Sequence, residues 1–283
     1  MILFENRAAE VLYKTLTKIQ NKKFLLPLNV CPIVPDTFLK ANKEFEFIDI
    51  DLETLCMDNS SALQRIDEDN EIDGILFVKT FGVEFDIQPF YRKIKDMNRN
   101  IFIIDDMCPC VPEFEHVIEK SYADLTLFST GYSKYVDIGY GGYGFLRDND
   151  FTGKFFDKDK GIEFFKYKNI VMEAIPKVRK HKQELNTIYK DNLPEELFLG
   201  DKFNNWRFSL LVDRKDVILE RIFEVDGLFA SSHYPQVDFQ YSKNPIPNSN
   251  TQAIHNRIVN LFNDFRFSKD QAYQTSRVIM GCL

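Results

Sequence analysis

Leu125–Gly142 reads LTLFSTGYSKYVDIGYGG, an apolar run that passes into a turn with one lysine and a glycine-rich end. The run Leu125–Phe128 is typical of a buried strand, which polar Ser129 ends. Lys134 and the glycine-rich segment Gly139–Gly142 follow. Glycine allows close backbone approach, hydroxyls and amides hold phosphate, and a lysine supplies a counter-charge or a nucleophile. The pattern therefore favours a glycine-lined site for a small anion. The alternative is a surface lysine in a loop.

A second apolar run, Ile101–Ile104, ends in Asp105 and Asp106. Such a run predicts a strand of a parallel sheet that is buried on both faces. Ligands of open α/β sheets bind outside the carboxyl ends of the strands, so an acid there is a site candidate. A strand-end aspartate with Lys134 after a later strand resembles the pyridoxal phosphate (PLP) pocket of fold-type I aminotransferases. In that pocket the acid pairs with the pyridinium nitrogen and the lysine binds the cofactor covalently.

The composition narrows the class of protein. The chain has 283 residues, a net charge of −7 and 44% hydrophobic residues, which is enough for a sizeable core. The acidic balance, with a pI near 5.3, gives no electrostatic support for nucleic-acid binding. No apolar run approaches the roughly 20 residues that span a bilayer, and the N-terminus lacks the pattern of a signal peptide. Five scattered cysteines fit no disulfide framework or zinc motif, so we expect a cytoplasmic protein.

The order of apolar patterns predicts an α/β fold, because strands alternate with helices of about ten residues. The expected strands are Lys23–Pro27, Phe45–Ile50, Asp73–Val78, Ile101–Asp105, Asp124–Phe128 and Tyr143–Leu146. The expected helices between them are Ala8–Ile19, Pro32–Ala41 and Ile87–Met97. We predict a large domain over residues 1–190, with a mostly parallel sheet between two helical layers.

The remainder, residues 191–283, predicts a small α+β domain. It follows a helical region over Ile162–Tyr189, in which we expect a break at Pro176. The expected strands of the small domain are Trp206–Val212 and Leu228–Ala230, and the expected helices are Val217–Val225, Gln252–Leu261 and Lys269–Met280.

Seven segments in this order resemble the DegT/DnrJ/EryC1/StrS family of PLP-dependent sugar aminotransferases across nearly the whole chain. They are Leu26–Pro32, Phe47–Leu55 (FIDIDLETL), Phe81-Gly82 with Asp86, Ile103–Asp106, Phe128–Gly142, Arg207-Phe208 and His233–Pro235. The resemblance implies fold-type I architecture, PLP as the cofactor and a homodimer with active sites at the interface.

The resemblance also implies a role for individual residues. Lys134 would bind the cofactor and move the proton between the α-carbon of the amino donor and the cofactor. Asp106 would hold the pyridinium nitrogen protonated, which makes the ring an electron sink. The other implied cofactor contacts are Ser129 and the turn Asn6-Arg7-Ala8 at the phosphate, and Cys31 at the ring. His233 and Tyr234 are the implied substrate residues.

Several positions depart from the family pattern. Asn6 replaces the glycine of the phosphate turn, Pro109 stands where glutamine or histidine is usual, and Gly131 where histidine is frequent. The chain is shorter than most members. The segment Phe151–Asn169 replaces a GyNxR loop, from which a neighbouring subunit normally lends an asparagine to the pocket.

The function expected from the resemblance is transfer of an amino group from an amino acid, glutamate by family habit, to a nucleotide-linked keto-sugar. Such a reaction belongs to surface polysaccharide or amino-sugar biosynthesis. A second hypothesis is a relative that binds PLP but has lost sugar transamination. A third ignores the resemblance: Asp105 and Asp106, with Asp49 and Asp51, would hold Mg²⁺ in a nucleotide-sugar or phosphoryl transferase.

Overall fold

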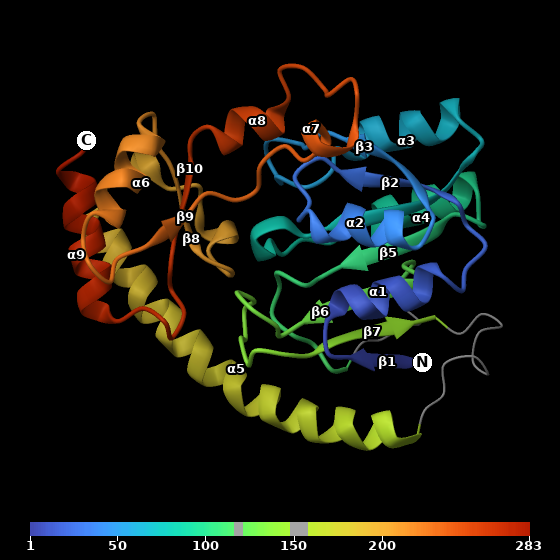
Figure 1. Cartoon of the computed structure of the whole chain (residues 1–283), viewed down its shortest axis with the longest axis horizontal. Coiled ribbons are helices and arrows are strands. Elements are labelled where there is room, and N and C mark those ends of the chain that lie inside the picture. Colours follow the sequence, from blue (N-terminus) through green and yellow to red (C-terminus); the bar gives the residue numbers. More distant parts are fainter. Residues whose placement is uncertain (116–120, 148–157) are drawn as a thin grey trace.

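The computed structural model describes residues 1–115, 121–147 and 158–283. Residues 151–157, the first part of the segment that replaces the expected asparagine loop, lie outside this description. A large sheet with helices on both faces lies beside a smaller lobe, and the long helix α5 (Lys158–Asn192) runs along both (Figure 1). The described helices include none that is long and apolar enough to cross a membrane.

The large sheet has seven strands in the order β1-β7-β6-β5-β4-β2-β3. They are β1 (Ile2–Glu5), β2 (Lys23–Pro27), β3 (Glu44–Ile48), β4 (Ile72–Val78), β5 (Phe102–Asp106), β6 (Leu125–Ser129) and β7 (Gly142–Leu146). Five consecutive strands, β3, β2, β4, β5 and β6, are parallel, and β7 runs antiparallel to both β6 and β1. The predicted mostly parallel sheet is thus confirmed.

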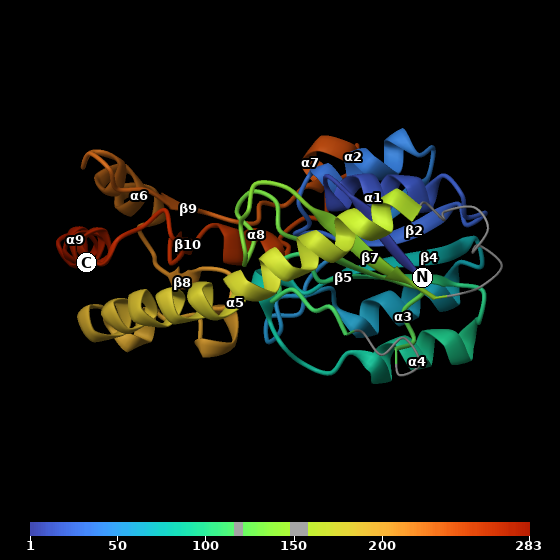
Figure 2. The ribbon, with the colours of Figure 1, turned by 90° about the horizontal axis from the view of Figure 1, so that it is seen from below.

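Two helices cover each face of the sheet, as the view from below shows (Figure 2). On one face lie α1 (Ala8–Leu16) and α2 (Ile33–Lys40), and on the other α3 (Asn59–Glu68) and α4 (Gln88–Met97). Alternate strand residues supply the two cores, because successive side chains of a strand point to opposite faces. Ile104 of β5 packs into the core with α1 and α2, whereas Ile103 packs into the core with α3 and α4.

The smaller lobe is built on a three-stranded antiparallel sheet in the order β8-β10-β9. Its elements are β8 (Phe208–Leu211), α6 (Lys215–Phe223), β9 (Ala230–Ser231), β10 (Ile258–Leu261) and α9 (Lys269–Met280). The C-terminal half of α5 packs on this sheet through Leu185 and Tyr189. Its N-terminal half packs beside β1 and β7 through Phe164 and Tyr167.

Two expectations for this half of the chain are wrong. The helix predicted over Gln252–Leu261 ends early: α8 spans Asn250–His255, and Ile258–Leu261 forms β10. Ile258 and Val259 are buried at the centre of the small sheet, where β-branched side chains pack well. No break occurs at Pro176, which lies inside α5. Pro176 is exposed, as is Met172 four residues earlier, so the carbonyl freed by the proline can bond to water.

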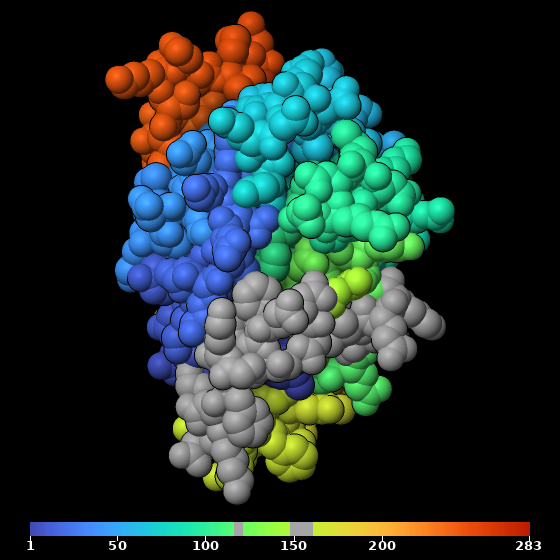
Figure 3. All heavy atoms as spheres, turned by 90° about the vertical axis from the view of Figure 1, so that its right-hand side faces the viewer, coloured from blue at the N-terminus to red at the C-terminus, as the bar shows by residue number. Residues whose placement is uncertain are grey.

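A segment of the predicted small domain returns to the large sheet. Tyr241 of α7 (Asp238–Tyr241) donates a hydrogen bond of 2.7 Å to Asp36 of α2, and Asp49 accepts bonds from Asn250 and Thr251 at the start of α8. In the space-filling view, the orange atoms of this segment lie against the blue and cyan surface of the large sheet (Figure 3). The boundary at residue 190 stays a prediction.

Candidate active site

A cavity of about 420 Å³ opens at the carboxyl ends of β5 and β6, beside the N-terminus of α1. We call it the Lys134 cavity. Six of the residues predicted as cofactor contacts line it: Arg7, Ala8, Cys31, Asp106, Ser129 and Lys134. Leu12, Val34 and Leu127 add an apolar wall. Segments that lie up to 127 residues apart in the sequence therefore meet at one strand edge, where open α/β sheets bind ligands.

The two adjacent aspartates of β5 point to opposite faces of the sheet. Asp106 lines the cavity on the α1 face, and its Oδ1 accepts a 2.9 Å hydrogen bond from the Cys108 amide. Asp105 lies on the α4 face beside Tyr91, and its buried Oδ1 has no hydrogen-bond partner among the described residues. Burial raises the pKa of Asp105 to about 6, although nearby Lys79 opposes this shift. Of the two carboxylates, Asp106 is the one available to a ligand in the cavity.

Lys134 enters the cavity from the loop after β6, and none of the described residues forms a hydrogen bond with its Nζ. Burial alone would lower the pKa of Lys134, but the acidic groups of Cys108, Tyr234 and Asp106 outweigh it and raise the pKa. An unbonded amine facing a carboxylate inside a cavity is a candidate nucleophile or proton carrier.

The backbone next to Lys134 is fixed by its neighbours. Ser133 has a positive φ of 60°, a conformation that residues with a side chain rarely adopt. Its amide donates a 2.8 Å bond to Asp137, and its carbonyl accepts a 2.5 Å bond from the Trp206 indole. Such over-determined strain clusters at functional sites, and here it holds the lysine in position.

An anion-binding corner lies at the other end of the cavity. Arg7 is the N-cap of α1 and makes no side-chain cap bond, and the first amides of α1 have no partner within the helix. Gly131 lies under the Arg7 side chain: a Cβ there would be 2.8 Å from Arg7 Nη1 and 3.6 Å from Ser129 Oγ. A helix N-terminus, a guanidinium and a hydroxyl therefore converge, and this combination suits a phosphate.

Gly131 lines the cavity, whereas Gly139–Gly142 are not among its lining residues. A Cβ on Gly142 would lie 1.9 Å from the Ala8 amide nitrogen, and a Cβ on Gly141 would lie 2.3 Å from the Tyr167 ring. These glycines instead let the first turn of α1 and the helix α5 pack directly on β7. The close packing at Gly142 fixes the position of Arg7 and Ala8, which belong to the anion-binding corner.

The remaining predicted residues lie around the cavity rather than in its wall. Asn6 contributes its carbonyl, which accepts a 2.8 Å bond from Gly141. Tyr234 stacks on Trp206 with ring centroids 5.8 Å apart, and burial raises its pKa to about 12. Burial, together with nearby Arg207, lowers the pKa of His233 to about 4. The structure thus places His233 and Tyr234 behind Lys134.

Arg207, part of the Arg207-Phe208 motif, is a buried arginine near Lys134 to which the sequence assigns no role in the site. It is 3% exposed, forms no ion pair within the described residues, and lies over the Phe262 ring at 3.8 Å. Among the described residues its guanidinium donates hydrogen bonds only to the hydroxyls of Ser133 and Ser231, and burial lowers its pKa to about 10. The sequence signal was a lone arginine inside the apolar run WRFSLLV.

The Mg²⁺ hypothesis finds no geometric support. The described residues hold no cluster of metal-ligating side chains. Asp49 and Asp51 follow β3, which β4 and β2 separate from β5. Three strand spacings amount to about 14 Å, too far for these acids to share one ion with Asp106. Asp49 and Asp51 instead accept bonds from α8 and from Thr54.

No protein-family model matches the sequence, and no curated protein matches it. Solved structures do match its fold over nearly its whole length. DesI, solved in the presence of its TDP-sugar product, has a TM-score of 0.80 and 15% identity, over 99% of this chain and 80% of DesI. PseC of Helicobacter pylori, an aminotransferase of pseudoaminic acid biosynthesis, has a TM-score of 0.77 and 13% identity, over 99% of this chain and 86% of its own.

A DegT DnrJ EryC1 StrS aminotransferase from Brucella abortus has a TM-score of 0.73 and 14% identity, over 99% of this chain and 85% of its own. Because all these identities are low, the likeness concerns the fold. The chain has the α/β fold of the PLP-dependent sugar aminotransferases, as its sequence motifs predicted.

Proposed function

We propose that this chain is a PLP-dependent aminotransferase that transfers an amino group from an amino acid to a keto-sugar. One observation carries the proposal: Lys134, Asp106 and an anion corner converge on one cavity, in a fold shared with sugar aminotransferases. Each group fits a different part of PLP. When bound, the cofactor supplies an electron sink that makes a carbon-bound proton removable.

The residues that line the cavity have separate roles in binding the cofactor and in moving the proton. The phosphate of PLP would be held by Arg7, Ser129 and the first amides of α1, and the Asp106 carboxylate would keep the ring nitrogen protonated. Cys31 packs against the ring. Lys134 would hold the cofactor and would supply the amine that moves the proton.

The substrates and setting are part of the same proposal. We propose glutamate as donor and a nucleotide-linked keto-sugar as acceptor, in amino-sugar or surface-polysaccharide synthesis. The likeness to DesI, solved with its TDP-sugar product, and to PseC, of pseudoaminic acid biosynthesis, supports a sugar acceptor. We further propose a cytoplasmic homodimer whose active sites lie at the interface, and a substrate role for His233 and Tyr234 beside the cavity.

The test is spectroscopic. The protein is incubated with PLP and dialysed, its visible absorbance is recorded, and borohydride is added before peptide mass mapping. We expect a retained visible band and a stable modification on Lys134. Lys134→Ala removes both, whereas Lys166→Ala, an exposed lysine of α5, keeps both.

Glutamate then tests the amino transfer. It should bleach the band, and 2-oxoglutarate should appear. A band that glutamate and other amino acids leave unchanged contradicts transamination and supports a cofactor binder. No band in the unmodified protein contradicts the PLP proposal itself.

A further inference from the structure

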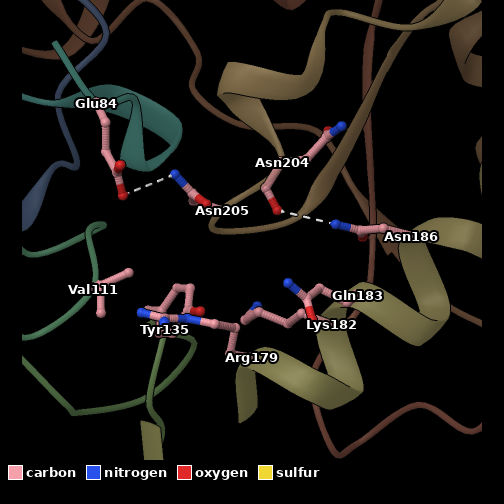
Figure 4. A pocket seen from close by; sticks show the side chains of 9 residues that line it. All are labelled: Glu84, Val111, Tyr135, Arg179, Lys182, Gln183, Asn186, Asn204 and Asn205. Carbon is pink, nitrogen blue, oxygen red and sulfur yellow. Dashed lines mark hydrogen bonds between the residues drawn. The ribbon is translucent and has the colours of Figure 1, made fainter. Parts of the chain in front are cut away.

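A second cavity, of about 270 Å³, lies between the large sheet and the C-terminal half of α5 (Figure 4). We call it the Lys182 cavity. It shares no lining residue with the Lys134 cavity. Its lining combines two cationic side chains, one carboxylate and four side-chain amides with the apolar surfaces of Val111 and Tyr135. Neither the sequence motifs nor the proposed aminotransferase reaction uses it.

Lys182 lies at the base of this cavity and is 4% exposed. Its Nζ donates a 2.7 Å bond to the Trp206 carbonyl and a 2.8 Å bond to Asn263 Oδ1. The Nζ also lies 5.2 Å from the centroid of the Tyr135 ring, and no oxygen or nitrogen of the described residues accepts a third hydrogen bond from this ammonium. Burial lowers the pKa of Lys182 to about 7, although Asp264 opposes this shift. A buried cation bonded only to neutral acceptors is stabilised by an anion that reaches it.

A second cation faces the same space. Arg179 precedes Lys182 by three residues, which places both on one face of α5. Figure 4 shows its side chain extending beside Tyr135, and it forms no ion pair within the described residues. The single carboxylate, Glu84, accepts a 3.3 Å bond from Asn205. The cavity therefore carries two basic side chains against one acidic side chain.

The side-chain amides that line the cavity indicate which neutral groups the ligand carries. Gln183, Asn186, Asn204 and Asn205 line the cavity. A side-chain amide both donates and accepts hydrogen bonds, which matches the hydroxyl groups of a sugar. Ligand clefts for drug-sized molecules measure about 300–1,000 Å³, so this smaller cavity suits one sugar ring rather than a nucleotide-sugar. We propose that the Lys182 cavity binds a polyhydroxylated anion of single-ring size, whose negative group is the carboxylate of a sugar acid or the phosphate of a sugar phosphate.

The chain contains its own reporter for this site. Trp206 is the only tryptophan of the sequence. Its carbonyl accepts the Lys182 bond, and its indole donates to the Ser133 carbonyl next to Lys134. An occupant that engages Lys182 therefore changes the surroundings of Trp206.

The experiment titrates the PLP-saturated full chain and follows tryptophan fluorescence. The probes are glucuronate, glucose 6-phosphate, inorganic phosphate and glucose. We expect saturable binding of glucuronate or glucose 6-phosphate, and the tighter of the two identifies the anionic group. Arg179→Gln should weaken this binding about tenfold, because it removes a charge-assisted hydrogen bond. Lys180→Gln is the matched control: it removes an exposed charge from the adjacent residue, which does not line the cavity, and should leave the affinity unchanged.

Three results would overturn the proposal. The first is no saturable change with either anionic sugar. The second is equal affinity for glucose or for inorganic phosphate alone, which contradicts recognition of a sugar ring with an anionic group. The third is equal weakening by Arg179→Gln and Lys180→Gln, which indicates a general charge effect. The readout is binding, so the result does not depend on transaminase activity.

Discussion

The two faces of the large sheet differ sharply where β5 ends. On the α1 face, Asp106 opens onto a cavity with an unbonded lysine and an anion corner. On the α4 face, Asp105 is enclosed with Tyr91 and Cys56, and burial raises the pKa of Cys56 to about 12. Adjacent residues of identical chemistry thus differ in whether a ligand can reach them. The alternation of the strand, rather than the type of side chain, separates the candidate catalytic acid from the enclosed one.

Substituting each of the two aspartates in turn tests this comparison most directly. We expect Asp106→Ala to lower kcat/KM for transamination by about 10²–10³-fold, the usual cost of losing one electrostatic contact in an active site. Asp105→Asn should change kcat/KM little, because the side chain lies on the other face. The measurement is steady-state kinetics with glutamate and a keto acid acceptor. A larger loss for Asp105→Asn would contradict the assignment.

The enclosed acid should instead affect stability. A carboxyl whose folded pKa is about 6, above the usual value near 4, binds its proton more tightly in the folded protein. Stability from this group is present at pH 4 and is lost as the pH rises through 6. The free energy of unfolding of Asp105→Asn, relative to the unmodified protein, should therefore increase between pH 4 and pH 7, by up to about 3 kcal/mol.

Urea unfolding at several pH values measures this difference. Asp96→Asn, an exposed carboxylate on α4, is the control and should show little pH-dependent difference. A difference that stays flat for Asp105→Asn would show that Asp105 is ionised at no cost in the fold.

On the α1 face, Gly142 lets the start of α1 pack closely on β7. Gly142→Ala places a methyl group where the Ala8 amide now lies, so α1 must shift away from β7. We expect a loss of about 2 kcal/mol in the free energy of unfolding, in the range of overpacked cores, together with weaker PLP retention. Gly161→Ala is the control, because a Cβ there meets open space in an exposed helix, and it should stabilise slightly. Chemical denaturation and a PLP dialysis assay measure both effects.

The last prediction concerns the protonation state of Lys134 and the rate at which PLP attaches to it. Its raised pKa keeps the side chain protonated at neutral pH, whereas attachment of PLP requires the free amine. The rate at which the visible band appears should therefore rise about tenfold per pH unit between pH 7 and 9. A rate that does not change with pH would indicate that the amine is already neutral in the folded protein.

The strands that build the site were predictable, because each is a short apolar run followed by polar residues. Ile101–Ile104 and Leu125–Phe128 predicted β5 and β6, and the rule for strand ends predicted that Asp106 and Lys134 meet. The sequence pattern did not reveal which of the two aspartates faces the cavity. That distinction depends on which layer each strand residue enters, and the resemblance supplied it.

Other features depend on contacts between distant segments. Ile258–Leu261 looked helical because it continues the pattern of α8, and it becomes a strand only because β8 and β9 flank it. The helix α3 and the strand β1 were missed: α3 has few apolar residues, and β1 is four residues long. The role of Gly142 could not be predicted from the sequence either, because the atoms that pack against it belong to the distant residues Arg7 and Ala8.

The proline inside α5 has a mechanical consequence. Residues of α5 up to Val178 pack beside the large sheet, and those from Leu185 onward pack on the small sheet, so both ends of α5 are held in place. Pro176 removes one backbone hydrogen bond near the middle of α5, so the helix is least stiff at that point. Any rocking of one lobe against the other is therefore concentrated within one helical turn of Arg179, at the mouth of the Lys182 cavity.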